Sequence, residues 1–111
     1  MEVLFRTKKL QKVCNSAEEI IRRYGHERGK RLQRRLAELA AAGSLAEVAT
    51  LPQARLHSLS GDRAGQYAVD LQYPFRLILE PADEPVPSLA GGGVDLDRVT
   101  RVWIVEVVDY H

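Results

Sequence analysis

The hydrophobic period of the chain changes near Pro52, and this change restricts the fold more than any other feature. Before Pro52, apolar residues recur every three or four positions, as on one face of a helix. After Pro52, apolar and polar residues alternate, as in a strand with one buried face. The sequence therefore predicts helices first and most of a sheet second, which is typical of an α+β layer fold.

Two helical segments are predicted in the first half, after a short strand at residues 2–6. Residues 7–25 form either one helix or two helices with a break near Asn15-Ser16, where Ser16 and Glu19 have capping-box spacing. Residues 26–42 form the second helix, whose apolar stripe faces a core while its other side is basic.

Four further strands are predicted after Pro52, at residues 55–59, 66–73, 75–80 and 102–108. The last of these is nearly all apolar, so we expect a central strand buried on both faces. The expected fold is two N-terminal helices packed on one face of a four- or five-stranded, mainly antiparallel sheet. Residues 81–100 hold three prolines and three consecutive glycines, and so long a connection is typical of a functional or mobile segment.

The length and composition predict one domain with no cofactor. A chain of 111 residues suffices for a single core, and no apolar run approaches the roughly 18 residues of a membrane helix. Since no secretory signal precedes the first strand, we expect a cytoplasmic protein without a membrane partner. The single Cys14 excludes an internal disulfide and a cysteine metal cluster, and we expect it to be a buried apolar residue.

Positive charge is concentrated near the N-terminus. Residues 1–36 hold 11 Lys/Arg and 4 Asp/Glu, for a net charge of 11 − 4 = +7, while residues 37–111 hold 5 and 11, for −6. A basic surface of this kind can attract the phosphates of RNA, although a merely solvated helix face is the alternative. The residues predicted to bind phosphates on this surface are Lys8, Lys9, Lys12, Arg28, Lys30, Arg31, Arg34 and Arg35, and the resemblance described below implies RNA or the ribosome as their target.

Some of the side chains after Pro52 suit RNA cleavage without a metal. The reaction needs a base for the 2′-hydroxyl proton, an acid for the leaving 5′-oxygen and a cation for the phosphate. The sequence places suitable groups on strands or at strand ends, namely His57, Arg76, Asp109 and His111. Spacing alone does not bring them together, and we interpret the third histidine, His26, as a surface residue.

Three stretches of the sequence carry a resemblance to a known family. Residues 56–69 read LHSLSGDRAGQYAV, residues 75–79 read FRLIL and residues 106–111 read EVVDYH. In this order they resemble the motifs L-H-x-L-x-G-D-R-x-G-x-[WY]-x-V, [WY]-R-[LI]-x-F and E-x-x-D-Y-H of HigB-like toxins in the RelE/ParE superfamily. The resemblance spans nearly the whole chain. Within it, we interpret Gly61-Asp62-Arg63 as a structural turn.

The resemblance implies the toxin of a type II toxin–antitoxin pair that cuts messenger RNA on the ribosome. Its implied partner is a HigA-like antitoxin with a helix-turn-helix. By matching motif, His57 and His111 become the acid and base candidates, and we assign the acid to His111. Arg76 would bind the scissile phosphate, Asp109 would orient or share the proton, and Tyr110 would stack on a base. No metal is implied.

Two departures from the family pattern leave alternatives open. Some HigB toxins carry a lysine where this chain has Ser60, so one cation is missing unless another Lys or Arg replaces it. Residues 81–100 are also longer than in the shortest relatives. The alternatives are a ParE-like toxin that inhibits DNA gyrase without cutting RNA, and a non-catalytic module that binds nucleic acid or an antitoxin. Retention of His57 and the terminal Asp-Tyr-His favours the nuclease.

Overall fold

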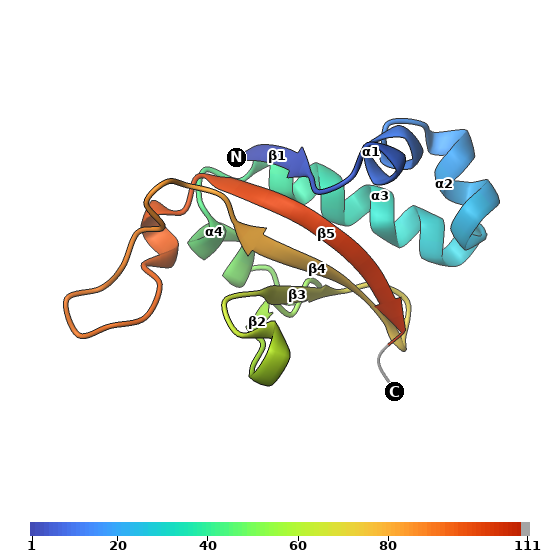
Figure 1. The fold of residues 1–111 in the computed structure, drawn as a ribbon. Helices are drawn as coiled ribbons and strands as arrows, with labels where there is room; N and C mark the ends of the chain where they lie inside the picture. Colours follow the sequence, from blue (N-terminus) through green and yellow to red (C-terminus); the bar gives the residue numbers. More distant parts are fainter. Residues whose placement is uncertain (110–111) are drawn as a thin grey trace.

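The computed structural model describes residues 1–109, which form a five-stranded sheet with helices packed on one of its faces (Figure 1). The strand order is β1-β5-β4-β3-β2, in which β1 and β5 are parallel and the other three pairs are antiparallel. The predicted α+β class and the mainly antiparallel pairing agree with this sheet. Its strands are β1 (Glu2–Phe5), β2 (His57–Ser58), β3 (Tyr67–Asp70), β4 (Phe75–Pro81) and β5 (Arg101–Asp109).

Three helices, rather than the two of the expected fold, precede the main part of the sheet. They are α1 (Lys8–Cys14), α2 (Ala17–Tyr24) and α3 (His26–Ala41), and a short α4 (Leu45–Ala49) follows. The break between α1 and α2 lies where the capping pattern predicted it, because Ser16 Oγ accepts a hydrogen bond from the Glu19 backbone N–H at 3.2 Å. Gly25 separates α2 from α3 with a φ of 84°, a conformation that favours glycine.

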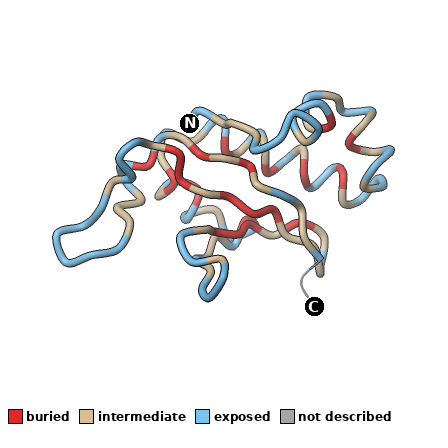
Figure 2. The backbone as a smooth tube through the Cα atoms, viewed as in Figure 1, coloured by how far each residue is buried: buried red, intermediate tan, exposed pale blue. Residues whose placement is uncertain are grey.

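The core lies between the helices and one face of the sheet. Leu77 and Leu79 of β4 and Ile104 of β5 are fully buried against Leu32 and Leu39 of α3 (Figure 2). No helix among residues 1–109 is long and apolar enough to cross a membrane.

The expectation that the last strand is buried on both faces was wrong. In β5, Ile104 is buried on the helix side, whereas Trp103 is half-buried and Glu106 is exposed. Helices cover only one side of the sheet, so polar groups can occupy the other. There the Arg6 guanidinium lies over the Trp103 ring, 5.1 Å from its centroid, and forms an ion pair of 2.7 Å with Glu80.

The loop between β2 and β3 covers part of this second face. It contains the 3-10 turn η1 (Gly61–Arg63), which begins at Gly61 with a φ of 64°. Arg63 of the turn donates hydrogen bonds to Gln66 at 2.9 Å and to Glu106 of β5 at 2.7 Å. Glu106 lies opposite Ile78 in the sheet, and Ile78 is fully buried although no helix covers it. The Gly-Asp-Arg segment is thus a turn tethered over the sheet.

The predicted strand at residues 66–73 is shorter in the structure because the chain turns after Asp70. The backbone N–H of Asp70 donates to Ala54 O at 2.8 Å, and that of Leu71 donates to Phe75 O at 3.0 Å. The first bond joins the end of β3 to the segment before β2, and the second closes the connection from β3 to β4, so residues 71–73 lie outside the sheet.

The long connection from β4 to β5 extends from the body as an arm (residues 82–100; Figure 1). A bridge between Ser88 and Val94 pairs its two sides, and a second 3-10 turn, η2 (Leu96–Arg98), returns the chain to β5. The carboxylate of Asp83 holds the base of the arm closed, since it accepts hydrogen bonds from the backbone N–H groups of Thr100 and Arg101 and from the Thr100 hydroxyl at 2.8–3.2 Å.

We expect Asp83→Asn to destabilise the protein by about 1 kcal/mol at neutral pH, because hydrogen bonds to a charged acceptor are stronger than those to a neutral one. Burial alone would raise the pKa of Asp83, but the hydrogen bonds from Thr100 and Arg101 outweigh it and lower the pKa. A lowered pKa stabilises the fold above the pKa of the unfolded chain, and this stabilisation disappears as the pH falls through the folded pKa. Urea unfolding at several pH values should therefore show the two proteins converging below about pH 4. A constant difference would contradict this role.

Candidate active site at the edge of the sheet

His57 lies on the edge strand β2 with both ring nitrogens engaged. Its Nδ1 lies 2.8 Å from the carbonyl oxygen of Arg55, and its Nε2 lies 3.3 Å from Nη1 of Arg76. A carbonyl can only accept and a guanidinium can only donate, so this network assigns the proton to Nδ1 and leaves Nε2 as the acceptor. The ring is thereby oriented with a basic nitrogen facing a cation.

The strand register explains why residues 19 positions apart meet. His57 lies opposite Ala68, Ala68 lies opposite Ile78, and Asp70 lies opposite Arg76. Directly opposed residues share a face of the sheet, as do residues two positions apart on a strand. His57, Asp70 and Arg76 therefore share the face that the helices leave uncovered.

Asp70 connects this histidine to two arginines. Its carboxylate oxygens lie 3.4 Å from Nε of Arg55 and 3.5 Å from Nε of Arg76. Arg55, Leu56, His57 and Arg76 line a surface hollow of about 520 Å³, which we call the phosphate hollow. Two guanidinium groups on one hollow can bind a phosphodiester, and an imidazole beside them can accept a proton from a neighbouring hydroxyl group.

Arg55 and Asp70 were not among the site residues predicted from the sequence. Arg55 has a φ of 48°, in the left-handed region that non-glycine residues seldom adopt. Such strain persists only where the surroundings impose it, and here the Arg55 carbonyl is the acceptor for His57. The only sequence signal for Arg55 was its position two residues before His57. That position does not distinguish Arg55 from an ordinary surface arginine.

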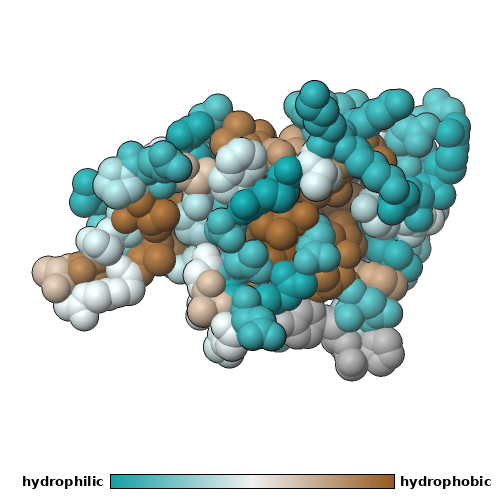
Figure 3. Space-filling view, in the orientation of Figure 1, coloured by the Kyte–Doolittle hydropathy of each residue, from teal (hydrophilic) through white to brown (hydrophobic). Residues whose placement is uncertain are grey.

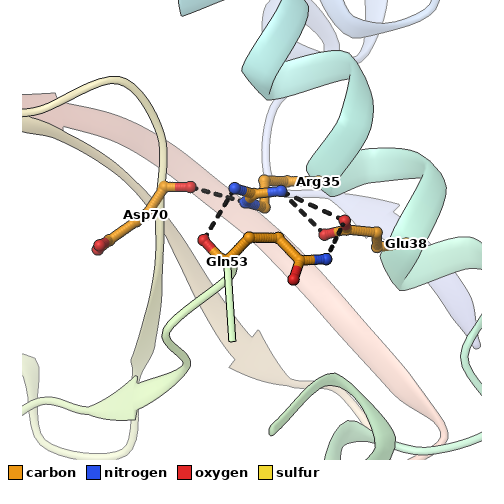
Figure 4. A network of polar contacts seen from close by, with 4 residues as sticks. All are labelled: Arg35, Glu38, Gln53 and Asp70. Carbon is orange, nitrogen blue, oxygen red and sulfur yellow. Dashed lines mark hydrogen bonds and ion pairs between the residues drawn. The ribbon is translucent and has the colours of Figure 1, made fainter. Parts of the chain in front are cut away.

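A network around the buried Arg35 joins the segment before Arg55 to the end of β3 (Figure 4). Arg35 of α3 donates from Nε to the Asp70 carbonyl at 2.8 Å and from Nη2 to the Gln53 carbonyl at 2.9 Å. Its Nη1 lies 3.1 Å from the carboxylate of Glu38, which also accepts from the Gln53 side chain at 3.0 Å. The network joins helix α3 to the end of β3 and to the residues before Arg55.

The prediction that Arg35 binds RNA at the surface was therefore wrong. The residue is only 3% exposed, and all three of its guanidinium nitrogens already donate within the protein. Helical periodicity did not reveal this, because the acceptors are backbone carbonyls from distant parts of the chain.

The other predicted cations fall into two groups. Arg28 is half-buried and stacks on Phe75, its guanidinium carbon 3.3 Å from the ring centroid, so its side chain is part of the packing at the start of β4. The remaining six are exposed and form no ion pair within residues 1–109: Lys8, Lys9, Lys12, Lys30, Arg31 and Arg34. We call these six the basic surface.

The C-terminal site residues are placed only in part. Asp109 is the last residue of β5 and lies opposite Phe75, while Val108 lies opposite Arg76. Asp109 is thus adjacent to the Arg76 position, but the register assigns it to the same face as Phe75. Tyr110 and His111 lie outside the described residues, so their predicted roles stay predictions.

The remaining reactive residues are separate from this site. Cys14 is half-buried, and burial raises the pKa of its thiol to about 11, which keeps it protonated at neutral pH. His26 is exposed at the start of α3. Within residues 1–109, no group of three or more His, Cys, Asp or Glu side chains is placed to hold a metal ion.

Comparison of the sequence with models of protein families and with curated protein sequences gives no match. Among solved structures, the fold is similar to that of a YoeB/ParE toxin from Agrobacterium tumefaciens, with a TM-score of 0.58 and 10% sequence identity over 100% of both chains. At this identity the likeness shows the fold alone, which is similar to that of this YoeB/ParE toxin.

Proposed function

We propose that this protein is the toxin of a type II toxin–antitoxin pair and that it cuts messenger RNA on the ribosome in the manner of HigB. The observation that carries the proposal is the contact of 3.3 Å between His57 Nε2 and the Arg76 guanidinium on the phosphate hollow. The toxin fold and the sequence motifs support it. Each of these two side chains also falls on a motif position that the resemblance assigns to RNA cleavage.

In the proposed reaction, His57 Nε2 accepts the proton of the 2′-hydroxyl, and the 2′-oxygen attacks the adjacent phosphorus. The bond to the 5′-oxygen breaks, which leaves a 2′,3′-cyclic phosphate and a 5′-hydroxyl. His111 is proposed to give the leaving oxygen its proton and Tyr110 to stack on a base, with Asp109 orienting that proton transfer from the end of β5 rather than from the face of His57 and Arg76. Asp70 holds Nε of Arg76, so the terminal nitrogens can turn from His57 to the phosphate.

Arg55 can replace the cation that some HigB toxins have as a lysine at the position of Ser60 in this chain. Its side chain is 73% exposed, and it borders the same hollow as Arg76. A second guanidinium at the phosphate can neutralise the charge that develops in the transition state. We propose that Arg55 takes this part.

The proposal is tested by adding the purified protein to translating ribosomes and mapping the ends of the messenger RNA. We expect new ends with a 2′,3′-cyclic phosphate and a 5′-hydroxyl, with EDTA having no effect. The name of the similar structure also includes ParE, so inhibition of DNA gyrase is measured in parallel. Gyrase inhibition without RNA cleavage would support the ParE-like alternative, and neither activity would support a non-catalytic module. A HigA-like antitoxin encoded next to this chain should form a complex with it and block cleavage.

We expect the basic surface to supply affinity for ribosomal RNA rather than chemistry. Changing Lys30, Arg31 and Arg34 to Glu should weaken ribosome binding and reduce its salt dependence by about one unit of log–log slope for each phosphate that the surface no longer neutralises. Binding is measured by sedimentation over a range of salt concentrations. Arg98→Glu, which reverses an exposed cation on the arm, is the control. Unchanged binding by the triple variant would mean that this surface only solvates the helix.

A further inference from the structure

A second hollow adjoins the phosphate hollow and shares two residues with it. Its volume is about 240 Å³, and its walls include Leu56 and His57, which also line the phosphate hollow. The two hollows therefore lie on either side of the same short segment of the edge strand. A ligand that occupies both would pass around the edge strand at Leu56 and His57.

The arm builds the opposite wall of this second hollow. Val94 and Leu96 pack against the core from the returning side of the arm, and both line the hollow. In Figure 3 the arm extends from the body, with apolar side chains gathered near its base. Residues 82–100, which had no assigned role from the sequence, thus complete a cavity beside the candidate base.

The lining suits a flat aromatic ring with polar edges. Leu56, Val94 and Leu96 of the lining are apolar, whereas Ser58 and Tyr67 each carry a hydroxyl group. Burial raises the pKa of Tyr67, so its hydroxyl remains a hydrogen-bond donor at neutral pH. The cavity is smaller than the roughly 300–1,000 Å³ of pockets for drug-sized ligands, so it suits a single ring system.

We propose that this second hollow binds the base of the nucleotide whose 2′-hydroxyl attacks. This inference rests on the proposed function, because His57 then faces the 2′-hydroxyl and the phosphate hollow holds the 3′-phosphate. Base, 2′-hydroxyl and 3′-phosphate belong to one nucleotide, which matches two hollows that meet at His57. The arm is thereby part of the selection of the cleavage site, and we call the second hollow the base pocket.

The test uses nucleoside 3′-monophosphates, which carry all three groups and offer no bond to cleave. Calorimetry compares the four monophosphates with methyl riboside 3-phosphate, which lacks a base. We expect at least one nucleotide to bind about 10-fold or more tightly than the riboside, because the base adds apolar contact with Leu56, Val94 and Leu96. Equal affinities for all five ligands would overturn the proposal.

A filling variant gives a second readout. Ala49 is exposed at the end of α4 and lines the base pocket, so Ala49→Leu should occupy the pocket without disturbing the core. It should reduce the affinity for the preferred nucleotide to that for the riboside. Ala41→Leu makes the same change at an exposed alanine that ends α3, and it should bind as the unmodified protein does. If both variants bind the nucleotide equally, the base is not in this pocket.

Cleavage of messenger RNA separates this inference from the proposed function. If the unmodified protein cuts RNA and Ala49→Leu cuts the same positions at the same relative rates, the base pocket is wrong while the nuclease stands. If the unmodified protein cuts no RNA, the nuclease is wrong, and nucleotide binding still decides whether the pocket accepts a base.

Discussion

Replacing His57 with alanine should lower the rate of messenger RNA cleavage by about 10²–10⁴-fold, the usual contribution of a positioned acid or base. In the structure, His57 is half-buried on a two-residue edge strand, and its side chain hydrogen-bonds to Arg55 O and Arg76. The loss should therefore appear in the chemical step, with little effect on folding. The rate is measured in a single turnover on programmed ribosomes, with thermal melting as the check on the fold.

His26→Ala is the matched control for this experiment. His26 is exposed at the start of α3 and does not line the phosphate hollow, so its removal should leave the rate unchanged. A His57→Ala protein that cuts RNA at the rate of the control would show that the 2′-hydroxyl proton goes to another group. The proposed mechanism would then be wrong even if the chain proves to be a nuclease.

Replacing Arg35 with leucine should have the largest effect on stability, a loss of about 3 kcal/mol. The change leaves the carbonyls of Gln53 and Asp70 without their donor and the Glu38 carboxylate without its cation. Arg35 is itself buried and its partners lie at the edge of the core. Removing one partner costs more than the interaction contributes, because the groups left behind lose their hydrogen bonds without full access to water. For a chain of this length the melting temperature should fall by roughly 10–20 °C.

Arg34→Leu is the control for this change, because Arg34 is the exposed neighbour of Arg35 on α3. It should shift the melting temperature only slightly, since surface substitutions usually change stability by less than about 0.5 kcal/mol. The opposite pattern, with Arg35→Leu stable but weak in ribosome binding, would restore Arg35 to the RNA-binding surface. Urea unfolding of both variants, with ribosome sedimentation of Arg35→Leu against the unmodified protein, distinguishes these outcomes.

The helices and strands that the sequence predicted correctly are those that depend on patterns among neighbouring residues. The change of period near Pro52 separates the main helices from the main strands, and the Ser16 cap and Gly25 divide the helical region where their chemistry requires it. The motifs also singled out His57 and Arg76, which the sheet brings into contact. Each of these signals acts over a few residues, so a single sequence is enough to detect it.

Only the tertiary structure decided which groups meet and which are buried. The covered face of the sheet depends on how the helices pack, so the nearly apolar run of β5 could not reveal that Glu106 is exposed. Likewise, Arg35 resembles any cation on a helix until the carbonyls of Gln53 and Asp70 approach it. Burial and pairing depend on contacts between residues that are far apart in the chain. The hydrophobic period describes only neighbouring residues, so it cannot predict those contacts.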